Sequence, residues 1–280
     1  MNSPAPALLH SAFYAFVDLP DPAGVVAELR RISQGVLGSI LVATEGVNGA
    51  VAGPSTEVQA FEQALRSPGF CDGVFAAMVF KHSQALTPPF GRMVVNLKPE
   101  IVALGKPEVR AAAPDASHLS PQAWRALLAE PDVVLLDNRN RFEHRLGHFV
   151  GTPSPPVGNF REFADHVEAM APQWRAERRK VAMYCTGGIR CEKTGAWMQS
   201  LGLETYQLQG GILNYFAQMP DAERDWVGEC YVFDRRVALD THLSETATTA
   251  EQVYDPSQPD EAWRLARALR LDQLDDDPST

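Results

Sequence analysis

The residues best suited to chemistry lie in the run 181–191, which reads VAMYCTGGIRC. Cys185 follows an apolar run typical of a buried strand, and Gly187 and Gly188 predict a tight loop before the next helix. Such a loop directs backbone N–H groups and the positive end of the helix dipole toward one point, where Arg190 adds a full charge. We therefore expect the pKa of Cys185 to fall below the value near 8.5 of a free thiol, which leaves a nucleophile at neutral pH.

The length of this loop narrows the chemistry. Four residues separate Cys185 from Arg190, namely Thr186, Gly187, Gly188 and Ile189. Cysteine phosphatases use a longer loop to cradle a tetrahedral phosphate, so the shorter loop suits a single transferred sulfur atom better. The alternative interpretation is a buried, inert cysteine at the end of a strand.

Further charged and sulfur-containing residues are expected near this loop. Asp137 ends the apolar run 133–137, and the carboxyl ends of parallel strands share one edge of a sheet. Asp137 and Arg139 therefore either line the pocket or form a structural ion pair. Cys191 is either a resolving thiol for an oxidised Cys185 or a packing residue. The basic residues that either face the phosphates of a nucleic acid or cover a solvated helix end are Arg178, Arg179, Lys180 and Lys193.

Charge and composition exclude several classes of protein. The net charge is −10, and residues 221–280 carry 15 acidic against 6 basic side chains, so the chain is not a basic nucleic-acid-binding protein as a whole. Residues 139–193, however, contain 10 basic and 6 acidic side chains, a local excess of positive charge that permits contact with a polyanion. No run is long and apolar enough for a membrane span. The N-terminus lacks the basic start of a secretory signal, and four unevenly placed cysteines favour a reducing cytoplasm.

No cofactor or metal motif is present in the sequence. A GxGxxG dinucleotide fingerprint, paired zinc-type cysteines and a two-histidine-one-carboxylate set are all absent. The expectation is a protein without a metal site and without an identified cofactor.

Strand and helix patterns divide the chain into an α+β part and an α/β part. Residues 1–98 follow the order β-α-β-β-α-β, with strands expected at 8–17, 36–44, 50–53 and 75–80, and a further strand expected at 93–97. This order predicts a ferredoxin-like domain, an antiparallel sheet with two helices on one face. The proline-containing run 99–119 predicts a linker.

The second half alternates strands with helices. Apolar runs at 133–137, 181–185 and 205–208, separated by helical patterns, predict a parallel α/β domain over 120–222. Residues 223–280 are expected as a C-terminal extension that is partly disordered, a poorly structured acidic tail with one short amphipathic stretch at 261–271.

Two motifs resemble the rhodanese (sulfurtransferase) family. The Cys-x4-Arg loop of residues 185–190 is similar to the active loop of that family. Upstream, Asp137, Arg139, Glu143, Gly147 and His148 follow its Asp-x-Arg-x3-Glu-x3-Gly-His signature. The resemblance implies a rhodanese-like fold for the second domain.

A wider set of motifs resembles one bacterial group, the rhodanese-domain tRNA uridine-34 hydroxylases. The motifs are EGVNG (45–49), FREF (160–163), CTGGIRCEK (185–193), YQLQGGILNYF (206–216), GEC (228–230) and YVFDRRVA (231–238). The resemblance covers about residues 10–240. It implies oxygen-dependent formation of 5-hydroxyuridine at the wobble position of tRNA, with O2 as co-substrate, and a required loop cysteine matched by Cys185.

The sequence departs from this group in two places. No cysteine follows Cys230, so the cysteine-rich C-terminal segment of some members is absent. Prolines at 153, 155 and 156 alter the segment after His148, which is expected to form a wall of the pocket. Two other functions stay open: a sulfurtransferase that carries a persulfide on Cys185, and a non-catalytic rhodanese-like module that binds RNA or protein. The sequence does not identify the tRNAs, the electron donor or the oligomeric state.

Overall fold

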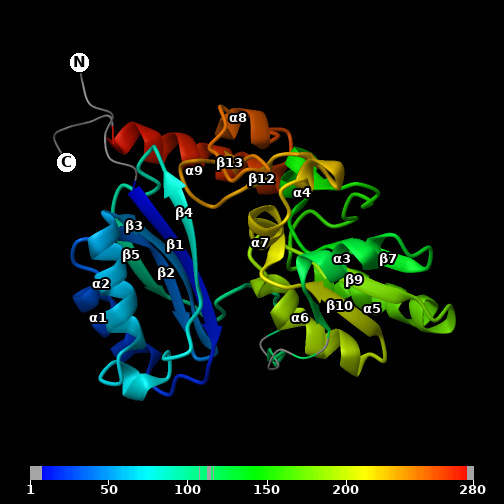
Figure 1. Ribbon diagram of the computed structural model, residues 1–280, viewed down its shortest axis with the longest axis horizontal. Coiled ribbons are helices and arrows are strands. Elements are labelled where there is room, and N and C mark those ends of the chain that lie inside the picture. The colour runs from blue at the N-terminus through cyan, green and yellow to red at the C-terminus, as the bar shows by residue number, and fades with distance from the viewer. Residues whose placement is uncertain (1–7, 107, 112–114, 116, 276–280) are drawn as a thin grey trace. The chain divides into compact units, whose positions relative to one another are not determined.

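The computed structural model describes residues 8–106, 108–111, 115 and 117–275, and side chains as far as Leu271 (Figure 1). The chain forms two compact units. Unit 1 is Met1–Ala103 with Phe233–Arg236, and unit 2 is Leu104–Val232 with Val237–Thr280. The change from one unit to the other thus falls inside the segment 99–119 that the sequence indicates as a linker.

Unit 1 is a ferredoxin-like domain, as predicted. Its five-stranded sheet has the order β4-β1-β3-β2-β5, in which β5 is added parallel to β2 and the other pairs are antiparallel. The elements are β1 (Leu8–Phe16), α1 (Pro22–Ile32), β2 (Leu37–Ala43), β3 (Gly46–Gly53), α2 (Ser55–Arg66), a 3-10 turn η1 (Cys71–Gly73), β4 (Phe80–Ala85) and β5 (Met93–Leu97).

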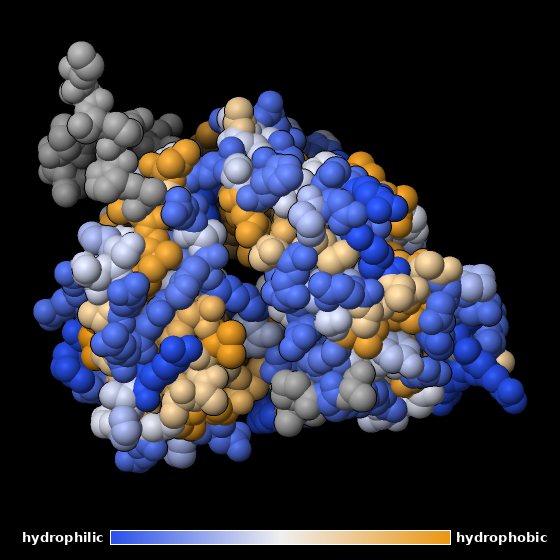
Figure 2. Space-filling view, viewed as in Figure 1, coloured by the Kyte–Doolittle hydropathy of each residue, from blue (hydrophilic) through white to orange (hydrophobic). Residues whose placement is uncertain are grey.

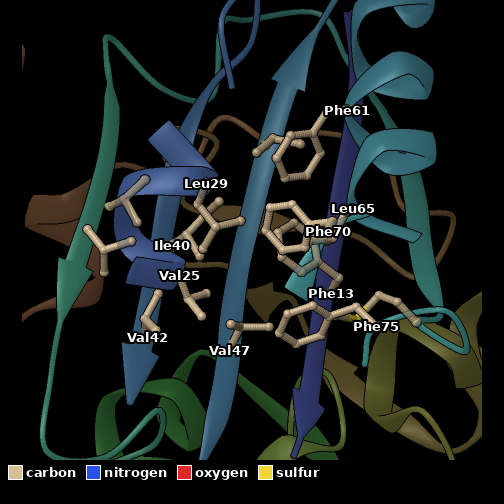
Figure 3. Close-up of a cluster of buried hydrophobic side chains, with 14 of the residues drawn as sticks. Phe13, Val25, Leu29, Ile40, Val42, Val47, Phe61, Leu65, Phe70 and Phe75 are labelled. Carbon is tan, nitrogen blue, oxygen red and sulfur yellow. The ribbon is translucent and has the colours of Figure 1, made fainter. Parts of the chain in front are cut away.

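The core of unit 1 lies between the sheet and its two helices (Figure 3). Phe13, Ile40 and Val47 come from one face of three neighbouring strands, and Leu29 and Leu65 come from α1 and α2. All five are at most 2% exposed. Burial of an aliphatic or aromatic side chain of this size contributes about 1.5–3 kcal/mol, so this layer accounts for the stability of the domain.

Two local predictions for unit 1 are wrong. The strand expected at 75–80 begins only at Phe80, because Phe75 and Met78 enter the core from a turn rather than from a strand. The strand expected at 50–53 begins earlier, because residues 46–49 also belong to β3, and Glu45 before it is buried, where its Oε1 accepts the Ile101 N–H at 2.8 Å.

Unit 2 contains a parallel sheet of the rhodanese-like kind, as predicted. Its strands have the order β6-β10-β9-β7, and every pair is parallel. The strands are β6 (His118–Leu119), β7 (Val133–Asp137), β9 (Lys180–Tyr184) and β10 (Glu204–Leu208). The helices between and after them are α3 (Pro121–Leu128), α4 (Arg141–Leu146), α5 (Phe163–Ala176), α6 (Ile189–Ser200) and α7 (Gly211–Gln218).

Short elements complete this unit. β8 (Gly147–Phe149) pairs with β11 (Trp226–Gly228), and β12 (Cys230–Tyr231) pairs with β13 (Ala238–Leu239), with the 3-10 turn η2 (Ala222–Arg224) before β11. α3 begins as the sequence predicts, because Ser120 Oγ accepts the Ala123 N–H at 3.3 Å and Pro121 occupies the first turn.

The acidic tail is more helical in its described part than its composition indicates. It forms α8 (Ala250–Val253) and α9 (Pro259–Asp275), while residues 276–280 lie outside the described residues. Val253, Tyr254 and Leu265 pack with Phe142 of α4 in one apolar cluster. The C-terminal extension is therefore attached to α4, the helix that carries Glu143 of the Asp-x-Arg-x3-Glu signature.

The surface in view is mostly hydrophilic, with smaller hydrophobic areas between (Figure 2). Among the described helices, none combines the length and the hydropathy that a membrane span requires.

Candidate active site

The Cys185 loop joins the carboxyl end of β9 to the first turn of α6. The backbone reverses at Gly188, whose φ of 99° lies in the left-handed region that favours glycine. This turn directs the Gly188 N–H at the Cys185 sulfur, with an N–Sγ distance of 3.1 Å. The sequence prediction of a strand, a tight loop and a helix that together direct N–H groups at the thiol agrees with this geometry.

The electrostatics of the loop favour a thiolate. Burial would raise the pKa of Cys185, but a hydrogen bond from the Cys191 thiol, the charge of Arg190 and backbone N–H groups of residues 190 and 191 outweigh burial and lower the pKa to about 6. The same contact acts on Cys191 in the opposite direction, since burial and the neighbouring thiolate raise its pKa well above the ordinary value. The two thiols therefore form a pair in which Cys185 is ionised and Cys191 donates.

Cys185 is closed off in this conformation. The residue is 1% exposed and Cys191 is fully buried. The sequence predicts an activated nucleophile at the sheet edge, and the activation is present, but open access to the sulfur is not. A substrate reaches the sulfur only after the residues that cover it move.

Helix α7 supports the loop from the side. The N–H groups of Ile212 and Leu213 donate to the carbonyl oxygens of Cys185 and Thr186 at 3.0 and 3.1 Å. Gly211 lies against the loop so closely that a Cβ there would come within 2.5 Å of the Cys185 oxygen. Sequence reasoning missed this contact, although the double glycine in YQLQGGILNYF was a signal for a close backbone approach.

Glu143 is a second residue outside the loop that positions it, and the sequence indicated Glu143 only as a member of the family signature. It is fully buried, its Oε1 accepts from Arg190 Nη2 at 3.1 Å, and its Oε2 lies 3.1 Å from Arg190 Nη1. Its other contacts are the Thr186 hydroxyl at 3.4 Å and both the backbone and side-chain nitrogens of Asn140, at 3.0 and 2.6 Å. The carboxylate thus fixes the guanidinium of Arg190 from the N-terminus of α4.

Asp137 and Arg139 form a structural ion pair at the same sheet edge. Both side chains are fully buried, with Arg139 Nη2 to Asp137 Oδ2 at 2.7 Å and Arg139 Nε to Asp137 Oδ1 at 2.8 Å. Tyr184 and His144 also reach Asp137 Oδ2, at 2.9 and 3.1 Å. Burial would raise the pKa of Asp137, but Arg139 and His144 hold it well below its usual range. Of the two interpretations that the sequence left open, the structure favours the ion pair over direct contact with the sulfur.

This arrangement gives the signature residues physical roles. Arg139 Nη2 also donates to the Gly147 carbonyl at 2.6 Å, so the pair connects the end of β7 to β8. The Asn138 N–H donates to the Tyr184 carbonyl at 2.9 Å, immediately before Cys185. The Asp-x-Arg-x3-Glu segment therefore supports the backbone immediately before Cys185, through Asn138, and holds Arg190 through Glu143.

The predicted tRNA-binding residues are not gathered at the loop. Lys193 is fully buried in α6, so its assignment to a phosphate contact at the surface is corrected. Arg179 and Lys180 lie at the other end of β9, about 16 Å from Cys185 by the rise of a strand. Lys180 pairs with Glu130 at 2.6 Å, and Arg179 donates to the Asp132 carbonyl at 3.0 Å. Together with Arg178, they belong to the amino edge of the sheet.

The remaining cysteines have packing environments. Burial raises the pKa of Cys230 to about 12, and it is fully buried. Burial also raises the pKa of the half-buried Cys71 in unit 1. Within the described residues no group of three or more histidine, cysteine or acidic side chains is arranged to hold a metal ion.

Comparison with known proteins connects this site to a family. Residues 9–101 match the family described as UPF0176 acylphosphatase like domain. A tRNA uridine(34) hydroxylase of Nitrobacter winogradskyi is 41% identical over 254 residues, which is 90% of this chain and 98% of that protein. The proteins of the same name from Legionella pneumophila and Deinococcus radiodurans are 39% and 42% identical, over 88% and 84% of this chain and 96% and 77% of theirs.

A rhodanese-related protein of Thermoplasma volcanium, whose crystal structure is known, aligns with 36% of this chain and 92% of its own at 18% identity and a TM-score of 0.28. The likeness is too weak to bear on the argument, whereas the relatives above share about two fifths of their residues over nearly the whole chain. The chain belongs to the tRNA uridine(34) hydroxylase family.

Proposed function

We propose that this protein hydroxylates uridine 34 of tRNA to 5-hydroxyuridine, with O2 as oxidant, in the cytoplasm. The observation that carries the proposal is the Cys185 thiol, with its pKa lowered to about 6, in a chain that is 41% identical to a tRNA uridine(34) hydroxylase over 90% of its length. An ionised sulfur held by N–H groups is the nucleophile that this reaction needs at neutral pH.

The thiolate has a specific task in this proposal. Attack of Cys185 Sγ on C6 of an extruded uracil makes C5 electron-rich, so that C5 adds O2 and the peroxide takes up one proton. Elimination of the thiolate together with the C5 proton, which passes to solvent, then restores the double bond between C5 and C6 and leaves a hydroperoxide on C5. Arg190 stabilises the sulfur anion before attack and after elimination, since it contributes to the lowered pKa. A second route, in which a sulfenate or persulfide on Cys185 takes part directly, needs the same residue.

The electron balance gives Cys191 a role. One atom of O2 enters C5 and the other leaves as water, which requires two electrons and two protons. Once Cys185 has left C6, its thiolate and the Cys191 thiol, which share a hydrogen bond, reduce the hydroperoxide as they join in a disulfide. The pair supplies the two electrons and one proton, and solvent supplies the second proton. An external dithiol must reduce that disulfide before the next turnover.

The closed position of the sulfur sets a condition on the mechanism. Because Cys185 is 1% exposed, a flipped uracil reaches it only in a conformation with the loop uncovered. Extrusion of the base from the anticodon loop is inexpensive, since bases there are already unpaired.

The direct test uses purified protein and tRNA that lacks the modification. Incubation under 18O2 should produce 5-hydroxyuridine that contains one 18O atom, detected by mass spectrometry of nucleosides. Absence of the product, or an oxygen atom that comes from water, would contradict the proposal.

Sulfur transfer is the second candidate, because a Cys-x4-Arg loop with an ionised thiol also fits a persulfide carrier. A thiosulfate:cyanide assay on the same preparation separates the two. Turnover to thiocyanate without 5-hydroxyuridine would favour the sulfurtransferase.

A further inference from the structure

Helix α9 presents two different faces. Glu261, Leu265 and Ala268 point inward: Glu261 is 1% exposed, and Leu265 and Ala268 pack on the cluster around Phe142. The neighbouring exposed face carries Trp263, Arg267 and Arg270, and the half-buried Arg264 lies at its boundary with the inward face, over Phe142. We call these four residues the arginine face.

The arginine face gathers like charges that the helix does not need. Residues 264, 267 and 270 follow one another at intervals of three, which places three positive charges side by side and disfavours the helix. Among the described side chains, neither Arg267 nor Arg270 has an ion-pair partner, and the nearby carboxylate of Glu261 is already bound to Arg145 at 2.6 Å. Repulsion of this kind is relieved by an anionic ligand.

An aromatic ring is part of the same surface. Arg264 stacks on Trp263, with its guanidinium carbon 4.6 Å from the ring centroid, and lies 5.4 Å from the centroid of Phe142. Trp263 is 50% exposed. A fixed guanidinium plane beside an exposed indole suits RNA, which offers phosphates to the arginines and bases to the rings.

The arginine face is connected to the thiol loop through α4. Arg145 of α4 donates to Glu261 of α9 and to the Val253 carbonyl, the latter at 2.6 Å. Glu143 of the same helix α4 holds Arg190. The surface and the reactive sulfur are thus supported by one helix within unit 2.

We propose that the arginine face binds the phosphate backbone of the tRNA. The proposal rests on the proposed function, because it assumes that tRNA is the substrate, and it adds a surface for that substrate away from the thiol. The sequence beyond Leu271 is acidic, so the proposed surface is confined to residues 263–270.

The experiment measures binding of unmodified tRNA to the full-length protein by fluorescence anisotropy at several salt concentrations. The variant R264Q/R267Q/R270Q should bind about tenfold more weakly, and the slope of log K against log salt should fall by about two, since each phosphate contact contributes about 0.7–0.9. A second variant, R267Q/R270Q, retains the stacked Arg264 and should show about two thirds of the slope change of the triple variant. In the hydroxylation assay the triple variant should raise KM for tRNA and leave kcat unchanged.

A matched control removes the same charge elsewhere. R31Q/R92Q/R224Q replaces three exposed arginines of other elements, and its slope should stay close to that of the wild type. Thermal unfolding of all variants checks that α9 is still packed.

Three outcomes overturn the proposal: a wild-type protein that does not bind tRNA, an unchanged slope in both arginine-face variants, or an equal change in the control. If the triple variant R264Q/R267Q/R270Q no longer bound vesicles of phosphatidylcholine and phosphatidylserine that the wild type binds, but still bound tRNA as the wild type does, the surface would be assigned to lipid instead. Because binding is measured apart from catalysis, a wild type that binds but does not hydroxylate counts against the proposed function and leaves the slope comparison to decide this inference.

Discussion

At the scale of single residues, the charge on one sulfur depends on three neighbours. The Cys191 thiol and Arg190 lower the pKa of Cys185 against the effect of burial, and Glu143 holds Arg190 in place. Glu143 also carries a negative charge, so it limits how much net positive potential reaches the sulfur. The thiolate therefore depends on directed hydrogen bonds as much as on the arginine charge.

This dependence predicts the pH profile of alkylation. Cys185 with a pKa of about 6 is ionised above that pH, so its rate of reaction with iodoacetamide should rise to a plateau with a midpoint near pH 6. Restricted access of the reagent to the sulfur, which belongs to a residue that is 1% exposed, makes the plateau rate slow, and the midpoint near pH 6 already includes the effect of burial on the pKa. In Arg190→Gln the midpoint should move up by about one unit, because an opposite charge is lost. Peptide mass spectrometry identifies the alkylated residue.

Cys71 in the same molecule is the internal control, since burial raises its pKa and its rate should still be rising above pH 9. A Cys185 midpoint at 8.5 or higher would show that the loop does not activate the thiol.

Residues of the site differ in how far sequence could identify them. The lowered pKa of Cys185 follows from its local run alone, because the loop and helix that act on it are adjacent in sequence. Glu143 acts across more than forty positions, and only its place in a family signature indicated it. Lys193 was misplaced because its charge indicated a surface position, whereas its place on α6 buries it.

At the scale of elements, the loop is held by the start of α7. Two hydrogen bonds from α7 and the close approach of Gly211 fix the backbone of residues 185 and 186. The reactive segment is thus positioned from both sides, by α4 through Glu143 and by α7 through its first N–H groups.

Gly211→Ala should therefore damage catalysis more than stability. The new Cβ would meet the backbone of residues 185, 186 and 188 at a φ of 72°, so we expect at least a tenfold loss of 5-hydroxyuridine formation and an unfolding free energy lower by about 1–3 kcal/mol. Gly210→Ala is a close control, because Gly210 has the same φ and its Cβ would also come within 3.0 Å of a neighbour, but its three nearest atoms all belong to Asn214 rather than to the Cys185 loop. Equal activity of the two variants would show that contact with the loop is unimportant.

Elements with strong local patterns could be predicted, and elements defined by distant partners could not. α3 has its serine cap and first-turn proline in sequence, whereas β6 consists of two residues that become a strand only by pairing with β10. In the described part of the tail, the amphipathic stretch expected at 261–271 lies within α9, but the ion pair between Arg145 and the buried Glu261, which joins this helix to α4, could not be predicted from the local pattern.

At the scale of the whole molecule, the chain builds two units with separate cores. All five tryptophans lie in unit 2, at positions 124, 174, 197, 226 and 263. Tryptophan fluorescence therefore reports on unit 2, while circular dichroism reports on both units.

This distribution allows a test of how independent the two cores are. Leu29→Ala opens a cavity in the core of unit 1, where Leu29 is fully buried, and should cost that unit about 2–5 kcal/mol. In urea, the circular dichroism transition should gain an early phase, and the fluorescence midpoint should remain close to that of the wild type. A fluorescence midpoint that moves together with the dichroism would show that the units unfold as one.

The chemistry of the whole molecule depends on one sulfur atom, and one measurement addresses it directly. tRNA is isolated from cells in which the gene has been replaced by the wild type, by Cys185→Ser or by the control Cys71→Ser, and 5-hydroxyuridine at position 34 is quantified by mass spectrometry. We expect wild-type levels with Cys71→Ser and a loss of at least a hundredfold with Cys185→Ser, because a serine hydroxyl is not ionised at neutral pH. Wild-type levels of 5-hydroxyuridine in the Cys185→Ser cells would contradict this expectation.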